Sequence, residues 1–142
     1  MEYLNFTLDH QYTGLEWADG GYADLHNNFD FVELSHSPAA ATLRLSWRKS
    51  TGEWARNVPW TGLHLVFEGV SYLRVKERDP AYPFSEDATL EHICRLPREA
   101  QEEFENIYFN EDAQPDYDLL LYFESEWGLK VNAASVSLQL EF

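Results

Sequence analysis

The clearest pattern of apolar and polar positions lies in residues 117–142, YDLLLYFESEWGLKVNAASVSLQLEF. Leu119, Leu121 and Phe123 fall on one side of an extended backbone, and the residues between them are also apolar. A strand that is apolar on nearly both sides belongs in the middle of a sheet. We therefore expect a central strand here and treat it as the element around which the fold is organised.

A turn and a returning strand follow. Residues 124–128, ESEWG, predict a tight turn in which Gly128 supplies a positive φ angle. The apolar residues of the returning strand stand at odd positions up to Ala133 and at even positions from Val136 onward. Side chains of a strand alternate with a period of two, so this change of parity requires an extra residue. We expect a β-bulge or bend at Ala134–Ser135.

A second long alternating pattern covers residues 63–76, where one face is formed by the odd-numbered residues Leu63, Leu65, Phe67, Gly69, Ser71, Leu73 and Val75, so parity is kept past Gly69. The preserved parity favours one long strand bent at Gly69. The alternative is a hairpin that turns at Glu68–Gly69, but Glu-Gly is a poorer hairpin turn than Asn-Gly or Asp-Gly.

The first half of the chain predicts shorter elements. Residues 4–8 alternate like a half-buried strand, and residues 9–28 predict a long loop with one brief extended piece at 15–17. Strands are expected at 29–34 and 41–47, joined as a hairpin. The core face of the second of these strands consists of Leu43, Leu45 and Trp47.

Two short helices are expected late in the chain. One runs over residues 86–94, capped by Ser85–Asp87, and the other over residues 98–106 after Pro97. The second helix buries Ala100 and Phe104. The sequence therefore predicts a single, mainly β domain over residues 1–142, with α+β as the alternative. We expect an antiparallel β-sandwich or curled sheet of about six strands, with one or two short helices inserted around 86–106.

The net charge of the protein limits the kinds of molecule that it is expected to bind. Twenty-five acidic residues against ten basic ones give a formal net charge of −15, which disfavours binding to nucleic acid or to anionic membranes. A basic protein is the partner that this charge favours. One cysteine, Cys94, excludes an internal disulfide, and no signal peptide or membrane-spanning stretch is evident. We expect a soluble, cytoplasmic protein; nothing in the sequence fixes its oligomeric state.

The sequence contains no recognisable catalytic, metal-binding or phosphate-binding motif. The spacing of the glycines matches neither the dinucleotide-binding motif nor the Walker motif. The histidines and carboxylates match no local metal-binding motif. His92 cannot activate Cys94 from the same helix, so we interpret Cys94 as a buried structural thiol. The sequence thus predicts no catalytic residue, no metal ligand and no cofactor.

Two surface features could bind ligands. Residues 99–129 hold ten acids and no Lys or Arg, with aromatic residues interleaved. Acidic residues attract a basic protein during association, and aromatic residues bury surface in the complex, so this combination suits binding to a basic protein. The residues that we assign to this surface are Glu102, Glu103, Glu105, Tyr108, Asp112, Asp116 and Trp127. The second feature is the loop with Trp54, Arg56 and Trp60, whose rings could stack on sugars or other flat ligands.

The stretches LHLVFEGVSYL (63–73) and LLLYFESEWGLKVNAASVSL (119–138) give a layout that resembles small, acidic, uncharacterised bacterial β proteins. Some domains of that type are encoded as immunity proteins beside toxins, so the resemblance implies a non-enzymatic protein that binds a partner. It transfers no residue role. The first hypothesis is an acidic protein-binding module, the second a carbohydrate or small-ligand-binding β-sandwich, and the third a small hydrolase.

Overall fold

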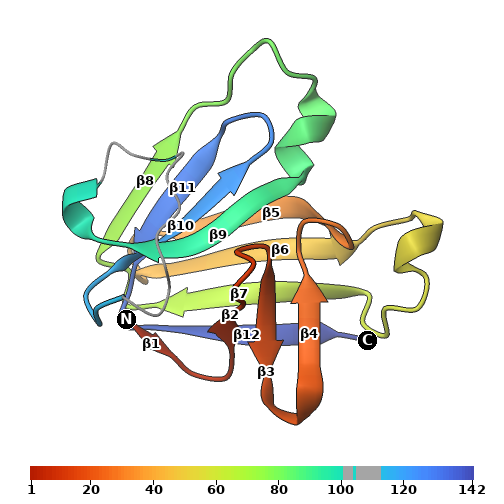
Figure 1. Cartoon of the computed structure of the whole chain (residues 1–142). Helices are drawn as coiled ribbons and strands as arrows, with labels where there is room; N and C mark the ends of the chain where they lie inside the picture. The colour runs from red at the N-terminus through yellow and green to blue at the C-terminus, as the bar shows by residue number, and fades with distance from the viewer. Residues whose placement is uncertain (101–103, 105–112) are drawn as a thin grey trace.

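The computed structural model describes residues 1–100, 104 and 113–142, which form a mainly β structure (Figure 1). In chain order, the strands are β1 (Glu2–Tyr3), β2 (Thr7–Leu8), β3 (Gly14–Trp17), β4 (Gly21–Asp24), β5 (Phe29–Ser37), β6 (Thr42–Lys49), β7 (Gly62–Glu68), β8 (Tyr72–Lys76), β9 (Leu90–Leu96), β10 (Asp118–Phe123), β11 (Gly128–Asn132) and β12 (Ser135–Glu141). Four short 3-10 turns accompany them: η1 (Ala18–Gly20), η2 (Glu53–Ala55), η3 (Phe84–Ala88) and η4 (Arg98–Ala100).

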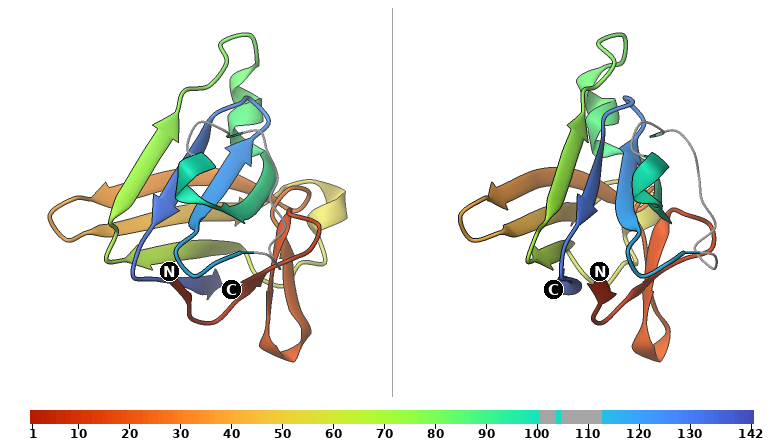
Figure 2. Two further views of the ribbon diagram at one scale, coloured as in Figure 1. Left: turned by 60° about the vertical axis from the view of Figure 1, so that its left-hand side comes forward. Right: turned by 90° about the vertical axis from the view of Figure 1, so that its left-hand side faces the viewer.

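These strands form three sheets, and in the part of the chain that the structure describes none of them closes on itself. The five-stranded sheet has the order β1-β12-β7-β6-β5, the four-stranded sheet β8-β11-β10-β9, and the three-stranded sheet β2-β3-β4. Neighbouring strands are antiparallel except β1 and β12, which are parallel. Figure 2 shows the four-stranded sheet rising from one side of the five-stranded sheet, with its strands running steeply across those of the larger sheet.

All three sheets contribute to one hydrophobic core. Its buried side chains include Leu15 of β3, Leu45 of β6, Leu65 of β7 and Leu121 of β10. Every residue of β10 is buried, because β9 and β11 flank it and side chains pack on both of its faces. The prediction of a central strand is confirmed, as is the β5–β6 hairpin with its core face at 43, 45 and 47.

The two bends expected from parity are places where the chain passes between the two large sheets. β7 and β8 lie in different sheets, and the chain turns between them at Gly69, whose φ is +69°. The chain likewise leaves β11 for β12 at Ala134, whose N–H donates to the Gly69 carbonyl at 3.1 Å. Residues 63–76 are therefore neither one continuous strand nor a hairpin, and Ala134–Ser135 marks a change of sheet.

The helix predicted at 86–94 is wrong. The chain makes the 3-10 turn η3 and then forms β9, which pairs with β10 from Leu90 to Leu96. Ile93 packs into the main core while Cys94 packs on the opposite face, so pairing and burial on both faces override the local helix signals. Of the helix predicted at 98–106, the described residues show only the turn η4.

The first 28 residues are more ordered than expected. β3 and β4 form a hairpin where a long loop was predicted, and residues 4–8 do not form one strand, since β1 and β2 join different sheets. Leu4 is 54% exposed between them. Twelve strands thus replace the predicted six in the described residues, and no helix among them is long and apolar enough to cross a membrane.

Candidate functional site

A hollow of about 270 Å³ lies beside the turn that joins β10 and β11. Three glutamates and two tyrosines line it, and we call it the glutamate pocket. Its residues are Tyr82, Glu91, Tyr122, Glu124 and Glu126. They come from the loop after β8, from β9, from β10 and from the β10–β11 turn, so the fold gathers four separate segments at one end of the four-stranded sheet (Figure 1).

A β-bulge frees Glu91 from the regular alternation of β9. Tyr122 of β10 stands opposite His92, but the next residue, Phe123, stands opposite Leu90. Glu91 is therefore the extra residue of the bulge and is exposed between two buried neighbours. Bulges re-aim side chains in this way, often beside functional sites.

Glu126 holds a backbone conformation that normally favours glycine. Its φ is +70°, and its N–H donates to the Phe123 carbonyl at 2.9 Å to close the turn. A side chain in this region costs on the order of 1 kcal/mol relative to glycine. The sequence assigned the positive φ to Gly128, which is wrong: Gly128 is needed because a Cβ there would stand 2.8 Å from the Leu121 carbonyl oxygen.

The glutamates act together on one phenol. Glu126 makes the largest contribution to raising the pKa of Tyr82, and Asp79, Glu124 and Glu91 raise that pKa further. Tyr82 is 38% exposed, so its ring faces both solvent and this negative charge. The pocket is thus electronegative, with an aromatic wall that solvent reaches.

Cations already lie near the pocket. Lys76 Nζ donates to the backbone carbonyl of Glu126 at 2.6 Å and stands 5.6 Å from the centroid of the Tyr122 ring. His26 Nδ1 lies 3.8 Å from a Glu124 carboxylate oxygen and 2.5 Å from the Leu90 carbonyl oxygen, which accepts a hydrogen bond from that nitrogen. The Tyr122 ring therefore presents a face to one ammonium group.

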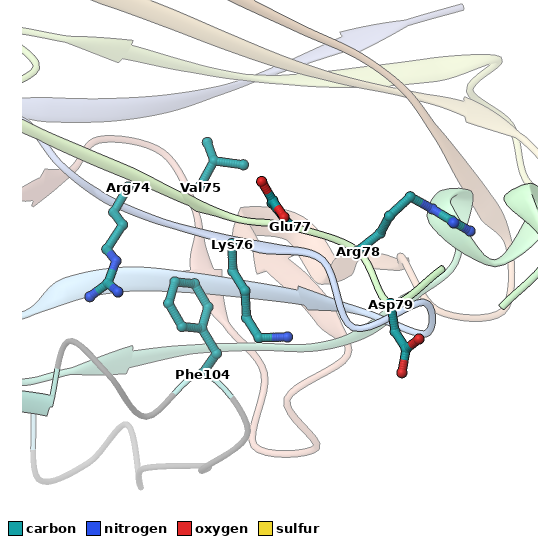
Figure 3. A pocket seen from close by; sticks show the side chains of 7 residues that line it. All are labelled: Arg74, Val75, Lys76, Glu77, Arg78, Asp79 and Phe104. Carbon is teal, nitrogen blue, oxygen red and sulfur yellow. The ribbon is translucent and has the colours of Figure 1, made fainter. Parts of the chain in front are cut away.

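A larger hollow of about 530 Å³ follows the edge strand β8, where Arg74, Lys76 and Arg78 alternate with Val75 and Glu77 (Figure 3). In Figure 3, Arg74 and Lys76 extend toward the Phe104 ring while Val75 and Glu77 point the other way. Arg78 binds Asp87 at 2.9 Å, Lys76 binds the Glu126 carbonyl, and Arg74 lies 5.7 Å from the Phe104 ring centroid. These cations are engaged within the protein, so this hollow offers a ligand less than its charge suggests.

Most of the predicted acidic surface lies outside the described residues, namely Glu102, Glu103, Glu105, Tyr108 and Asp112. Of the other two residues, Asp116 is exposed before β10, and its backbone carbonyl accepts from Asn132 at 3.0 Å. Trp127 stacks on Phe123 at 4.1 Å and donates its indole N–H to the Asp87 carbonyl at 2.8 Å. The Trp127 ring is thus used within the protein.

The tryptophans of the alternative ligand loop differ from each other. Trp54 is 69% exposed, and its indole N–H donates to the Asn27 carbonyl at 2.7 Å. Trp60 packs 5.2 Å from Trp17, at the edge of the core. Arg56 pairs with Glu53 at 3.4 Å on the surface.

Metal binding and thiol chemistry find little support in the described residues. Across residues 1–100, 104 and 113–142, no three His, Cys, Asp or Glu side chains gather in a way that could hold a metal ion. Cys94 is fully buried in β9. No family model, curated protein or solved structure matches this chain.

Sequence reasoning missed the glutamate pocket because its members lie far apart in the chain. The only local signal was the pair Glu124 and Glu126 in the predicted turn. Neither the bulge at Glu91 nor the approach of Tyr82 leaves a pattern in one sequence.

Proposed function

We propose that this protein is a protein-binding module whose glutamate pocket accepts a basic side chain of a partner protein. The observation that carries the proposal is the convergence of Glu91, Glu124 and Glu126 on a hollow with tyrosine walls. Carboxylates form strong charge-assisted hydrogen bonds with guanidinium and ammonium groups, and aromatic faces attract cations. The net charge of −15 would steer a basic partner toward this surface.

Arginine fits the pocket better than lysine. A guanidinium group is planar, binds carboxylates with two parallel hydrogen bonds and stacks on aromatic rings. Tyr82 supplies an exposed ring and the glutamates supply acceptors, so the pocket offers both kinds of contact. We expect an arginine on the partner surface to enter it.

The scaffold and the acidic segment have roles in this proposal. The two large sheets share one core, and we propose that they act as a sandwich that holds the β10–β11 turn rigid. Glu102, Glu103, Glu105 and Asp112 would add to the steering of the partner. An immunity-like role, in which the partner is a basic toxin, is the form of this function that the sequence resemblance favours.

A peptide titration tests the pocket directly. A capped Gly-Arg-Gly peptide should shift the NMR signals of residues around the pocket with a dissociation constant of about 1 mM, the level at which a few contacts are measurable. The same peptide with citrulline, which is uncharged and of similar shape, should bind far more weakly. Added salt should weaken the arginine peptide because charge attraction is screened.

Variants locate the binding. Combined Glu91→Gln, Glu124→Gln and Glu126→Gln should abolish the arginine-dependent shifts. The matched control changes three exposed glutamates of other elements, Glu2, Glu16 and Glu68, to Gln. This control variant should keep the arginine-dependent shifts. Equal shifts in both triple variants, or equal binding of the citrulline peptide, would refute the proposal.

A further inference from the structure

A second constellation lies on the other large sheet, on the face opposite the core. Ser46 Oγ is 2.7 Å from His64 Nδ1, and His64 Nε2 is 2.6 Å from a carboxylate oxygen of Glu141. We propose that Ser46, His64 and Glu141 form a nucleophilic relay that accepts an acyl group from an anionic ester. This inference is independent of the glutamate pocket and of the function proposed for it.

Strand register builds the relay. Ser46 of β6 and His64 of β7 are direct cross-strand partners, and their neighbours Leu45 and Leu65 point into the core. Glu141 of β12 stands opposite Gly62, two residues before His64 on the same strand and on the same face. A Cβ at Gly62 would stand 2.8 Å from the Trp47 carbonyl oxygen and 3.2 Å from a Glu141 carboxylate oxygen, so the glycine lets these groups approach closely.

The hydrogen bonds define the tautomer of the neutral imidazole. A carboxylate only accepts, so His64 Nε2 carries a hydrogen and donates a hydrogen bond to Glu141. In the neutral ring, His64 Nδ1 is then the unprotonated nitrogen and accepts a hydrogen bond from the Ser46 hydroxyl group. The hydrogen bond from His64 also holds the pKa of Glu141 below its usual value. Nucleophile, base and orienting carboxylate are thus connected in the order that acyl transfer requires.

The two ring nitrogens are exchanged relative to the familiar serine protease arrangement, in which the serine faces Nε2. Either nitrogen of a neutral imidazole can act as the base once the other carries the proton. The exchange therefore changes the orientation of the ring and leaves the roles intact.

Two arginines flank the serine along its strand. Arg44 and Arg48 stand two residues before and after Ser46 on the same strand, so they share its face. Both arginines add to the lowering of the Glu141 pKa, after the larger contribution of His64. Ser46 is 7% exposed, so a substrate reaches it only through a small opening in the surface of the sheet. Arginine groups can stabilise a developing oxyanion and attract a substrate that carries negative charge.

The chemical step is an acyl transfer. Ser46 Oγ bonds to the ester carbonyl carbon while its proton passes to His64 Nδ1. The carbon–oxygen bond to the leaving alcohol then breaks, and the alcohol takes that proton. Water then attacks the acyl carbon while its proton passes to His64 Nδ1. The bond between Ser46 Oγ and the acyl carbon breaks, Oγ takes that proton back, and the acid is released.

Covalent labelling distinguishes this relay from a set of hydrogen bonds that only ties three strands together. A small fluorophosphonate should add to Ser46, with loss of fluoride, and peptide mapping by mass spectrometry should locate the adduct. We expect His64→Gln to slow labelling by about 100-fold, the lower end of general-base effects. Ser137→Ala, which changes another serine on the same face of the sheet, should label at the wild-type rate.

A substrate comparison tests the anionic class. A p-nitrophenyl monoester of a dicarboxylic acid should acylate Ser46 faster than p-nitrophenyl acetate does, and combined Arg44→Gln and Arg48→Gln should remove the preference. Circular dichroism would confirm that each variant is folded. An adduct absent from Ser46, or equal labelling in folded wild type and His64→Gln, would overturn the relay. A faster reaction with the neutral ester would overturn the anionic substrate class.

Discussion

Gly69→Ala tests the corner at which the chain passes between the two large sheets. Gly69 has a φ of +69°, where an alanine costs about 1–2 kcal/mol. An added Cβ would also stand 2.8 Å from the Ala134 Cβ, well inside the contact distance of about 3.5–4.0 Å between carbon atoms. Relieving such overpacking costs roughly 1–3 kcal/mol. We therefore expect the free energy of unfolding to fall by about 2–5 kcal/mol in total.

Urea unfolding followed by tryptophan fluorescence measures this change, provided that the slope with urea stays constant. A double-mutant cycle separates the two costs. Ala134→Gly removes the atom that the new Cβ would strike, so Gly69→Ala should cost about 1–3 kcal/mol less in that background. A loss below about 0.5 kcal/mol for Gly69→Ala, the range of ordinary surface substitutions, would refute the reasoning about the corner. Equal costs in both backgrounds would refute the steric part alone.

Three further predictions concern charge and strain. Arg98→Ala should destabilise the fold by about 2–4 kcal/mol, because it removes two hydrogen bonds from the fully buried Asp118 carboxylate. Asp118→Asn should cost less, because the Arg98 side chain that loses its partner is partly exposed to water, and urea unfolding would show this order. Glu126→Gly should raise the free energy of unfolding by about 1 kcal/mol while weakening arginine-peptide binding, and a stability loss would contradict the strain at this residue. Burial lowers the pKa of His92, so the unfolded chain takes up this proton first as the pH falls below about 6.5. The free energy of unfolding should therefore fall more steeply in wild type than in His92→Gln between about pH 7 and 5, and parallel pH curves would contradict this.

Local patterns predicted those parts of the fold in which neighbours in sequence are also neighbours in space. The β5–β6 hairpin follows from two alternating stretches and a proline, and Leu43 and Leu45 pack where their parity places them. The burial of β10 on both faces follows from its unbroken apolar run. Each of these features depends only on the period of a strand.

Features that depend on distant partners were not predictable from the pattern. Residues 90–96 carry a polar and apolar order that also suits a short helix, and pairing with β10 decides for a strand. Gly69 preserves the parity of its stretch although β7 and β8 belong to different sheets. The β3–β4 hairpin consists of two four-residue strands, which are too short for periodicity to reveal.

The same reasoning applies to function, because net charge is visible in a sequence and a pocket is not. At physiological salt the Debye length is about 8 Å, so acids far from a contact act mainly on the rate of association. Glu91, Glu124 and Glu126 line one hollow. Neutralising these three glutamates should weaken the binding of a basic partner mainly by speeding its dissociation. Neutralising the remote residues Glu2, Glu16 and Glu68 should therefore slow association with a basic partner and leave its dissociation unchanged. A partner whose dissociation responds equally to both sets would be held by overall charge and not by the pocket.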